Sequence, residues 1–421
     1  NHMFSCYIGL WRDHIKECFR YSRAAYEAGI ESGDFTYGGY GGFHESWHAL
    51  FSGMDLDQYI EEYSVKLQFL SGYRYQSIGD AHQLMLQWGR CLQGKTDTLT
   101  LLDGDGFTEQ TYQDAYRDVP FFIAFYYVVK LNVCYLMQDY RAAMRYAEQA
   151  EKVIFGVRGM IWDALLCFYH ALALVAVFET LGTDEKDAAL KKLESLRARM
   201  RVWADNAPQN FAQQYDLIVA EIARISGHNA EAVMHYERAI DAAHEQGFIN
   251  IEALACELAG RFWLRRDRQR IAAAYLQDAT ARYRQWGANG KVRQLDEAYP
   301  DLANNVDQAS PGVAEGPQSL DIAAILNASQ AISGEMIMDQ LVARLMRIVL
   351  ENAGAERGLL ISPAGHDWHV EAVGAVGAVD GNTISLETSV PAGTTPGWSA
   401  GVVNYVSHTR EYLLSGDVQQ D

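Results

Sequence analysis

The sequence predicts a mainly α fold, in which an α-solenoid of stacked helix pairs is followed by a partial α+β domain. Two observations lead to this prediction. The stretch from Gln213 to Pro300 repeats itself, and the composition changes abruptly after residue 300. A repeated helix pair cannot bury its apolar face alone, so successive copies must stack on one another. We therefore expect most of the chain to form one helical array.

The repeat is defined by small residues that recur 40 positions apart. Ala239 overlays Ala279, and Gly247 overlays Gly287. An earlier string, AMRYAEQA from Ala143, parallels the string AVMHYERA inside the repeat and adds a third copy. The period is close to that of tetratricopeptide repeats, so we predict a tetratricopeptide-like array over residues 4–300.

The other helices of the array follow from apolar residues at helical spacing, bounded by glycine and proline. A first helix is predicted over residues 4–29, and the Asn-Ala-Pro break at 206–208 closes the pair that precedes the repeat. Together with the repeat, these segments give about seven helix pairs. The remaining predicted segments are two helices over 56–93, separated near Gly72 or Gly79, a pair over 121–155 around the Gln138–Asp139 turn, and a pair over 161–181 and 188–203.

Two loops resemble ligand-binding motifs without matching them. The glycines between Phe35 and Gly53 lack the lysine and the preceding strand of a phosphate-binding loop, so we interpret them as positions where a neighbouring helix approaches closely. The stretch DGDGFTEQTYQDAY from Asp103 begins like a calcium loop, but Phe107 occupies its fifth position and the expected glycine is missing from the sixth. We predict instead a loop that ends at Thr108, the cap of the next helix.

The composition changes after residue 300. Residues 301–319 are small and polar, contain two prolines and show no periodicity, so we predict a linker. Residues 320–352 form a long apolar-periodic helix in this interpretation. Strands are predicted near 357–362, 368–376 and 383–386, followed by a helix over 396–409 and a short strand over 411–414. This order predicts a small α+β domain over residues 320–421.

The composition also excludes several classes of protein. A formal net charge of −19 is unfavourable for binding nucleic acid or an anionic membrane, which needs clustered lysine and arginine. The longest apolar stretch, from Met160 to Phe178, contains Asp163 and His170, so a buried helix is expected there rather than a membrane span. The six cysteines form no CxxC pair and no secretory signal is visible, which predicts a cytoplasmic protein with free, mostly buried thiols. We expect the chain to be a piece of a longer protein.

Four strings carry a further resemblance. They are GFINIEALACELAGRFWLRR from Gly247, VWADNAPQNFAQQYDLIVAEIARISG from Val202, ESGDFTYGGY from Glu31 and LDIAAILNASQAISGE from Leu320. They resemble the middle section of very large bacterial and fungal signalling kinases, in which kinase-like and AAA-type nucleotide-binding domains precede helical repeats, a GAF domain and a histidine kinase. The resemblance implies that residues 320–421 are a signalling helix and a partial GAF-like domain. It also implies a non-catalytic section, since no HRD or DFG motif is present.

His44, Glu45 and His48 form the literal motif HExxH of zinc hydrolases. On a helix, the two histidines would bind zinc and the glutamate would act as general base. Against this interpretation, Gly38 to Gly42 make a poor helix start, and no later histidine completes a known pattern. Histidines that pack or cap a helix are the alternative, and no metal is expected.

The sequence therefore predicts a non-catalytic regulatory segment of a signalling kinase, which transmits conformational change through the helical array to the GAF-like module. We expect no cofactor, and the expected partners are other domains of the parent kinase. A scaffold that binds a peptide or protein on its concave face is one alternative, and the zinc hydrolase is the other. Tyr236, Tyr275, Tyr283 and Trp286 are expected in the repeat core. An apolar stripe on the helix over 320–352 favours a homodimer and comprises Ile322, Leu326, Ile332, Ile337, Leu341, Leu345 and Ile348.

Overall fold

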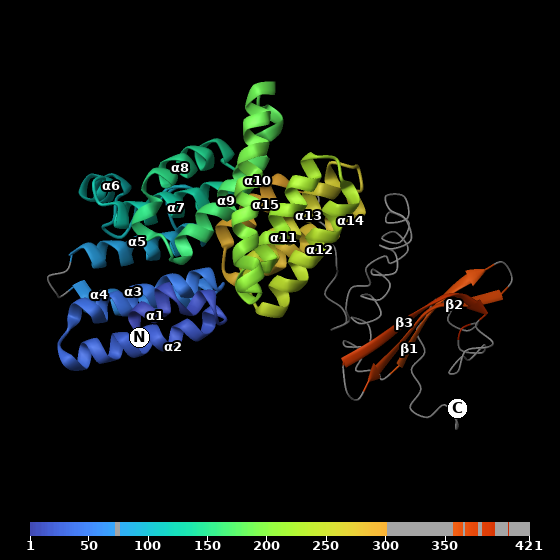
Figure 1. Ribbon diagram of the computed structural model, residues 1–421, viewed down its shortest axis with the longest axis horizontal. Helices are drawn as coiled ribbons and strands as arrows, with labels where there is room; N and C mark the ends of the chain where they lie inside the picture. Colours follow the sequence, from blue (N-terminus) through green and yellow to red (C-terminus); the bar gives the residue numbers. More distant parts are fainter. Residues whose placement is uncertain (72–75, 301–356, 365–366, 378–380, 392–402, 404–421) are drawn as a thin grey trace. The chain divides into compact units, whose positions relative to one another are not determined.

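The computed structural model describes residues 1–71, 76–300, 357–364, 367–377, 381–391 and 403. The chain divides into two compact units, Asn1–Leu320 and Asp321–Asp421. The described part of the first unit consists of helices and their connections, and the described part of the second contains three strands (Figure 1). The fold is therefore mainly α, as the helical periodicity predicted.

The helices of the first unit begin and end at residues that suit those positions. Thr108 caps α6 by accepting a hydrogen bond from the backbone N–H of Thr111, which confirms the predicted cap. Asp34 and Asp139 cap α3 and α8 in the same way. The helices are α1 (His2–Tyr7), α2 (Ile15–Ser32), α3 (Phe35–Phe51), α4 (Leu56–Ser71), α5 (Gln76–Leu92), α6 (Glu109–Tyr116), α7 (Pro120–Leu136), α8 (Tyr140–Val153), α9 (Ile161–Val177), α10 (Thr183–Asn206), α11 (Pro208–Ile225), α12 (Asn229–Gln246), α13 (Ile249–Leu264), α14 (Gln269–Trp286) and α15 (Asn289–Ala298).

One kind of turn joins the two helices of three pairs. Gln138, Gly227 and Asp267 each adopt a left-handed conformation, with φ of 64°, 79° and 58°. In each turn the next residue donates its N–H to the carbonyl five residues before it, which is the closure of a Schellman motif. The pairs α7–α8, α11–α12 and α13–α14 are therefore connected identically, in agreement with the three copies predicted from the sequence.

The 40-residue offset is retained in the structure. Helices α12 and α14 begin 40 positions apart, and each ends at a left-handed glycine, Gly247 or Gly287. Ala239 and Ala279 are both fully buried, so they occupy equivalent positions of successive pairs, as predicted. Their small side chains allow each second helix to lie close to the first.

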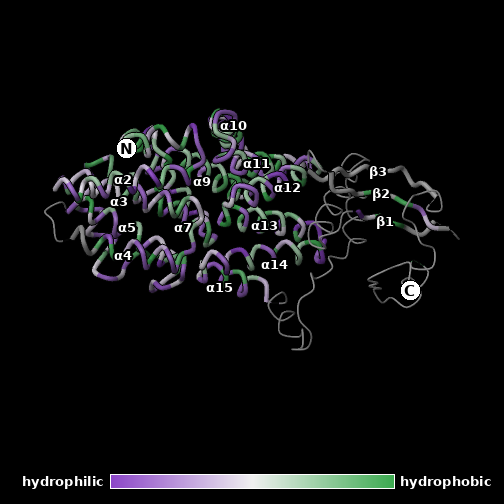
Figure 2. The backbone as a smooth tube through the Cα atoms, turned by 90° about the horizontal axis from the view of Figure 1, so that it is seen from below, coloured by the Kyte–Doolittle hydropathy of each residue, from purple (hydrophilic) through white to green (hydrophobic). Residues whose placement is uncertain are grey.

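Helices α7 and α9 lie in the core of the first unit because they are apolar on nearly every side. Almost every residue of α7 after Phe122 is buried, and so is almost every residue of α9 up to Val175. Hydrophilic and hydrophobic segments instead alternate along α12 and α14, which each have one exposed face (Figure 2).

One helical stretch among the described residues, Ile161–Thr180, is long and apolar enough to cross a membrane. Of its most apolar window, 83% is buried inside the first unit. The core helix of a folded domain meets the same criterion, so this finding agrees with the buried helix predicted from Met160 to Phe178.

The first unit closes on itself, because its early and late helices contact each other. Asn210 in α11 donates to the carbonyl of Leu10 at 2.7 Å, a residue 200 positions away. Asn250 in α13 donates to the carbonyl of Phe51 at 3.2 Å, across 199 positions. In a simple solenoid each repeat contacts only its neighbours. These long-range contacts show that the helices wrap around a shared interior.

Two predictions within the first unit were wrong. The helix predicted over residues 4–29 is interrupted, since α1 ends at Tyr7 and α2 begins only at Ile15. The glycines from Gly38 to Gly42 do not weaken the start of α3 but lie inside it. A Cβ atom on Gly41 would lie 2.7 Å from the backbone nitrogen of Tyr26 in α2. These glycines therefore permit a close helix–helix contact, which confirms the interpretation made from their sequence.

The described part of the second unit is an antiparallel sheet in the order β1 (Arg357–Ala364), β2 (Asp367–Gly377) and β3 (Gly381–Pro391). Each pairing contains one register shift, at Leu360/Ile361 and at Val370/Ala372. The three strands predicted here are thus confirmed. The predicted linker over 301–319, the helix over 320–352 with its apolar stripe, and the elements predicted after 392 lie outside the described residues.

Candidate functional site

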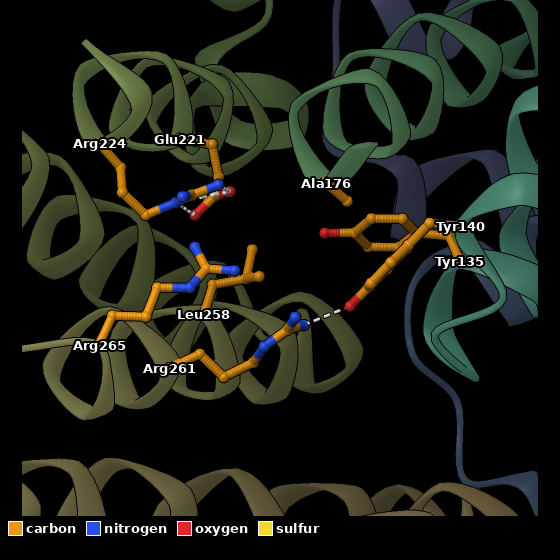
Figure 3. Close-up of a pocket in the computed structure, with 8 residues that line it drawn as sticks. All are labelled: Tyr135, Tyr140, Ala176, Glu221, Arg224, Leu258, Arg261 and Arg265. Atoms are coloured by element: carbon orange, nitrogen blue, oxygen red, sulfur yellow. Dashed lines mark hydrogen bonds and ion pairs between the residues drawn. The ribbon is translucent and has the colours of Figure 1, made fainter. Parts of the chain in front are cut away.

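A pocket rich in arginine lies between two groups of helices in the first unit (Figure 3). One side is formed by the end of α7, the start of α8 and the end of α9. The other side is formed by α11 and α13. The space between these side chains has a volume of about 10 Å³, enough for about one water molecule, and it is partly open to solvent. We call it the arginine pocket, and its lining residues are Tyr135, Tyr140, Ala176, Glu221, Arg224, Leu258, Arg261 and Arg265.

Two of the three arginines are held by neighbours. Arg224 donates to both carboxylate oxygens of Glu221 at 2.8–3.1 Å, and both side chains are buried. Arg261 donates to the hydroxyl of Tyr140 at 2.5 Å and lies 3.9 Å from the carboxylate of Glu257. Arginine remains charged in such surroundings, so these groups place fixed positive charge in the pocket.

Glu221 is ionised although it is buried. Burial alone favours its neutral form, but the charge of Arg224 and the hydrogen bonds from Arg224 and Tyr236 hold the pKa of Glu221 below its ordinary value. The Glu221–Arg224 pair is therefore a neutral unit, and it leaves the other two arginines without compensation from within the pocket lining.

Arg265 is the free cation of the site. It follows the last residue of α13, and its guanidinium points into the pocket between the Glu221–Arg224 pair and Arg261 (Figure 3). Its side chain makes no hydrogen bond or ion pair with the described residues. Three guanidinium groups and one carboxylate line the pocket, which is a local positive excess in a chain of net charge −19. A carboxylate or phosphate group matches this arrangement.

The sequence analysis did not identify this pocket. Arg261 and Arg265 are four positions apart, a spacing that places them on one face of a helix, and this was the available signal. Tyr140 and Glu221 come from other helices, and only the packing of α8, α11 and α13 brings them together. The predicted aromatic core is confirmed in part, because Tyr236, Tyr283 and Trp286 are buried whereas Tyr275 is half-buried.

The HExxH motif lies on α3, but its histidines face different neighbours. The ring of His44 faces α1 and stacks on the ring of His2, with 4.9 Å between centroids. The ring of His48 faces α2, where its Nδ1 lies 3.5 Å from the hydroxyl of Ser22. Burial holds the pKa of His44 well below 6.5 and lowers the pKa of His48 to about 3, so both rings are neutral at neutral pH.

The carboxylate of Glu45 forms ion pairs with two cations, so it is not available as a general base. Arg23 donates to its Oε1 at 2.8 Å, and the Nζ of Lys66 lies 3.0 Å from its Oε2. Within the described residues, the group of potential metal ligands that contains His44 includes neither Glu45 nor His48. The fold therefore does not bring together the paired ligands and general base that the zinc-hydrolase alternative requires.

Comparison with known proteins gives one partial likeness. No family model matches the chain, and no solved structure matches it. A curated protein, hybrid signal transduction histidine kinase G of Dictyostelium discoideum, is 24% identical over 221 residues. The match covers 44% of this chain and 6% of the kinase, so the chain spans a small part of that relative. The chain is thus a mainly helical protein with a distant similarity to part of a signal-transduction histidine kinase.

Proposed function

We propose that the first unit is a non-catalytic regulatory segment of a signalling kinase, which binds an acidic protein segment in the arginine pocket. The main support for this proposal is that the two sides of the pocket belong to different groups of helices. An anion that contacts Arg265 and Tyr140 together links these groups, so its affinity depends on their relative position. The likeness to a signal-transduction histidine kinase supports the signalling context.

We further infer that the helix pairs are tetratricopeptide-like repeats and that the strands of the second unit belong to a GAF-like domain. The identical turns at Gln138, Gly227 and Asp267 support the repeats, and the antiparallel order of β1, β2 and β3 is compatible with the domain. In this proposal the conformational change passes beyond α15 to residues 320–352, which lie outside the described residues and for which the sequence predicts a helix that pairs with a second copy of the chain.

The binding step is tested with a fluorescent glutamate-rich peptide, whose anisotropy reports its affinity for the purified chain. Arg265→Glu should weaken binding at least tenfold, about 1.4 kcal/mol, because it reverses the one unpaired charge of the pocket. Arg268→Glu is the matched control, since it makes the same change in net charge three positions away and outside the pocket lining. Binding should also weaken as salt is added.

The regulatory step is tested by hydrogen exchange with and without the bound peptide. We expect slower exchange in both α7–α9 and α11–α13, because the ligand joins them. Equal binding by the Arg265→Glu and Arg268→Glu variants would show that the pocket is not the site. Protection of only one group of helices would show that the pocket binds the peptide without transmitting a change between the two groups.

A further inference from the structure

A second cluster of chemically reactive side chains lies far from the arginine pocket along the chain, where α1 packs on α3. His2 and Cys6 come from α1 and His44 comes from α3. One potential ligand atom from each of the three residues lies within 4.8 Å of the others. Cys6 and His44 are buried and His2 is half-buried, so the cluster is closed on its inner side and accessible from His2.

His44 gives an independent indication of a ligand. Its ring is buried, and neither ring nitrogen has a hydrogen-bond partner among the described residues. A buried polar group without a partner costs roughly 1–3 kcal/mol. Such a cost is removed when a ring nitrogen binds a metal ion.

We propose that His2, Cys6 and His44 bind a zinc ion, with the thiolate of Cys6 and one ring nitrogen of each histidine as ligands. Sulfur and imidazole nitrogen are the donors that Zn²⁺ prefers, at about 2.3 Å and about 2.0 Å. Around a tetrahedral ion these donor atoms lie about 3.3–3.7 Å apart, so the metal-free cluster contracts by about 1 Å when zinc binds. His2 is the least buried ligand and is the first residue of the short helix α1, so it can make most of this movement.

Zinc binding releases a proton from the cluster. A cysteine thiol is mostly protonated at neutral pH, so Cys6 must lose its proton when zinc binds. The Sγ–H bond breaks, the proton passes to solvent, and the sulfur lone pair forms the bond to zinc. No oxidant or reductant is involved. The bound ion would tie α1 to α3 and hold the start of the chain against the first helix layer.

The proposed site shares His44 with the HExxH motif but differs from it in the other ligands. His48 lies one turn further along α3 and faces Ser22 and Phe19 of α2. A zinc hydrolase would need His48 and would not need Cys6. In the site proposed here, Cys6 is required and His48 is not.

The test uses the whole chain with its amino terminus acetylated, so that the terminal amine cannot serve as a ligand. Zn²⁺ binding is measured by calorimetry, and Co²⁺ binding is followed by absorption. We expect one equivalent of Zn²⁺ and, with Co²⁺, a thiolate-to-metal charge-transfer band together with the visible bands of a tetrahedral ion. Cys6→Ser and His2→Ala should each weaken binding at least tenfold, and Cys6→Ser should remove the charge-transfer band.

His48→Gln is the matched control and should keep both the affinity and the band. Far-UV circular dichroism confirms that each variant is folded before titration. Binding that survives Cys6→Ser but is lost in His48→Gln would show that the two histidines of the HExxH motif bind the metal instead. The absence of a charge-transfer band in the unsubstituted chain would overturn the proposal, and the stacked rings of His2 and His44 would then be packing contacts.

Discussion

Lys291 is a buried cation that joins three helices of the first unit. Only 1% of its side chain is exposed. Its Nζ donates to Glu257 of α13 at 2.8 Å and to the carbonyl of Leu136 at the end of α7 at 2.6 Å. The hydroxyl of Tyr283 donates to the other oxygen of Glu257 at 2.9 Å. This network connects the repeat to the middle of the array through one carboxylate.

We predict that Lys291→Met destabilises the first unit by about 3–5 kcal/mol, because the buried Glu257 carboxylate loses its nearest cation and keeps only Arg261, at 3.9 Å. Urea unfolding followed by far-UV circular dichroism measures this loss. Lys95→Met removes an exposed lysine that lies 3.3 Å from Asp57, and it should cost less than about 1 kcal/mol. Similar losses in the two variants would mean that the buried network contributes little.

At the scale of helices, the distance between α2 and α3 is set by glycine. A Cβ atom on Gly41 would lie 2.7 Å from the backbone nitrogen of Tyr26 and 3.0 Å from the backbone oxygen of Ser22. Backbone atoms cannot move away independently, so the two helices would have to separate. A Cβ atom on the adjacent Gly42 would meet only the ring of Tyr26, at 3.2 Å, and a ring can shift slightly.

The two glycines therefore give a matched pair of variants. Gly41→Ala should destabilise the first unit by about 2 kcal/mol or more, as expected for overpacking against a rigid neighbour. Gly42→Ala should be close to neutral, since the higher helix propensity of alanine, about 1 kcal/mol, offsets the smaller clash. Both values come from urea unfolding. Equal effects of the two substitutions would show that α2 and α3 are not in close contact at Gly41.

At the scale of the whole first unit, the interior holds neutral histidines. Burial lowers the pKa of both His48 and His82 to about 3. The unfolded chain protonates these rings near pH 6.5, whereas the folded chain does not. Because the folded pKa is depressed, their contribution to stability is complete above pH 6.5 and is lost as the pH falls from 6.5 towards 3.

We therefore predict that the free energy of unfolding falls between pH 7.5 and pH 5.5 by roughly 1 kcal/mol for each of these two histidines. Urea unfolding at the two pH values, with a chelator present, measures the change. His82→Leu should reduce this fall by roughly 1 kcal/mol, because leucine does not titrate, while the contributions of His48 and of His44, whose pKa burial also lowers, remain. His228→Ala controls for the loss of a histidine side chain as such, since His228 is exposed. A stability that does not vary over this range would contradict the burial of neutral rings.

The sequence by itself determined the local structure of this protein. The 40-residue offset, the turn at Gln138–Asp139, the cap at Thr108 and the three strands described in the second unit depend on residues that are close in sequence. Turn geometry, capping and hydrophobic periodicity act over a few residues, so each leaves a readable pattern.

Only the tertiary structure decided which distant residues meet. It interrupted the first predicted helix, placed the glycines of α3 against α2, and closed the array through Asn210 and Leu10. It also brought Arg265 near Glu221 and Tyr140, and His44 near Cys6. Long-range contacts such as that between Asn210 and Leu10 depend on the rotation between successive helix pairs, accumulated over many residues. That rotation is set by the packing of side chains between helices, which no single stretch of the sequence specifies.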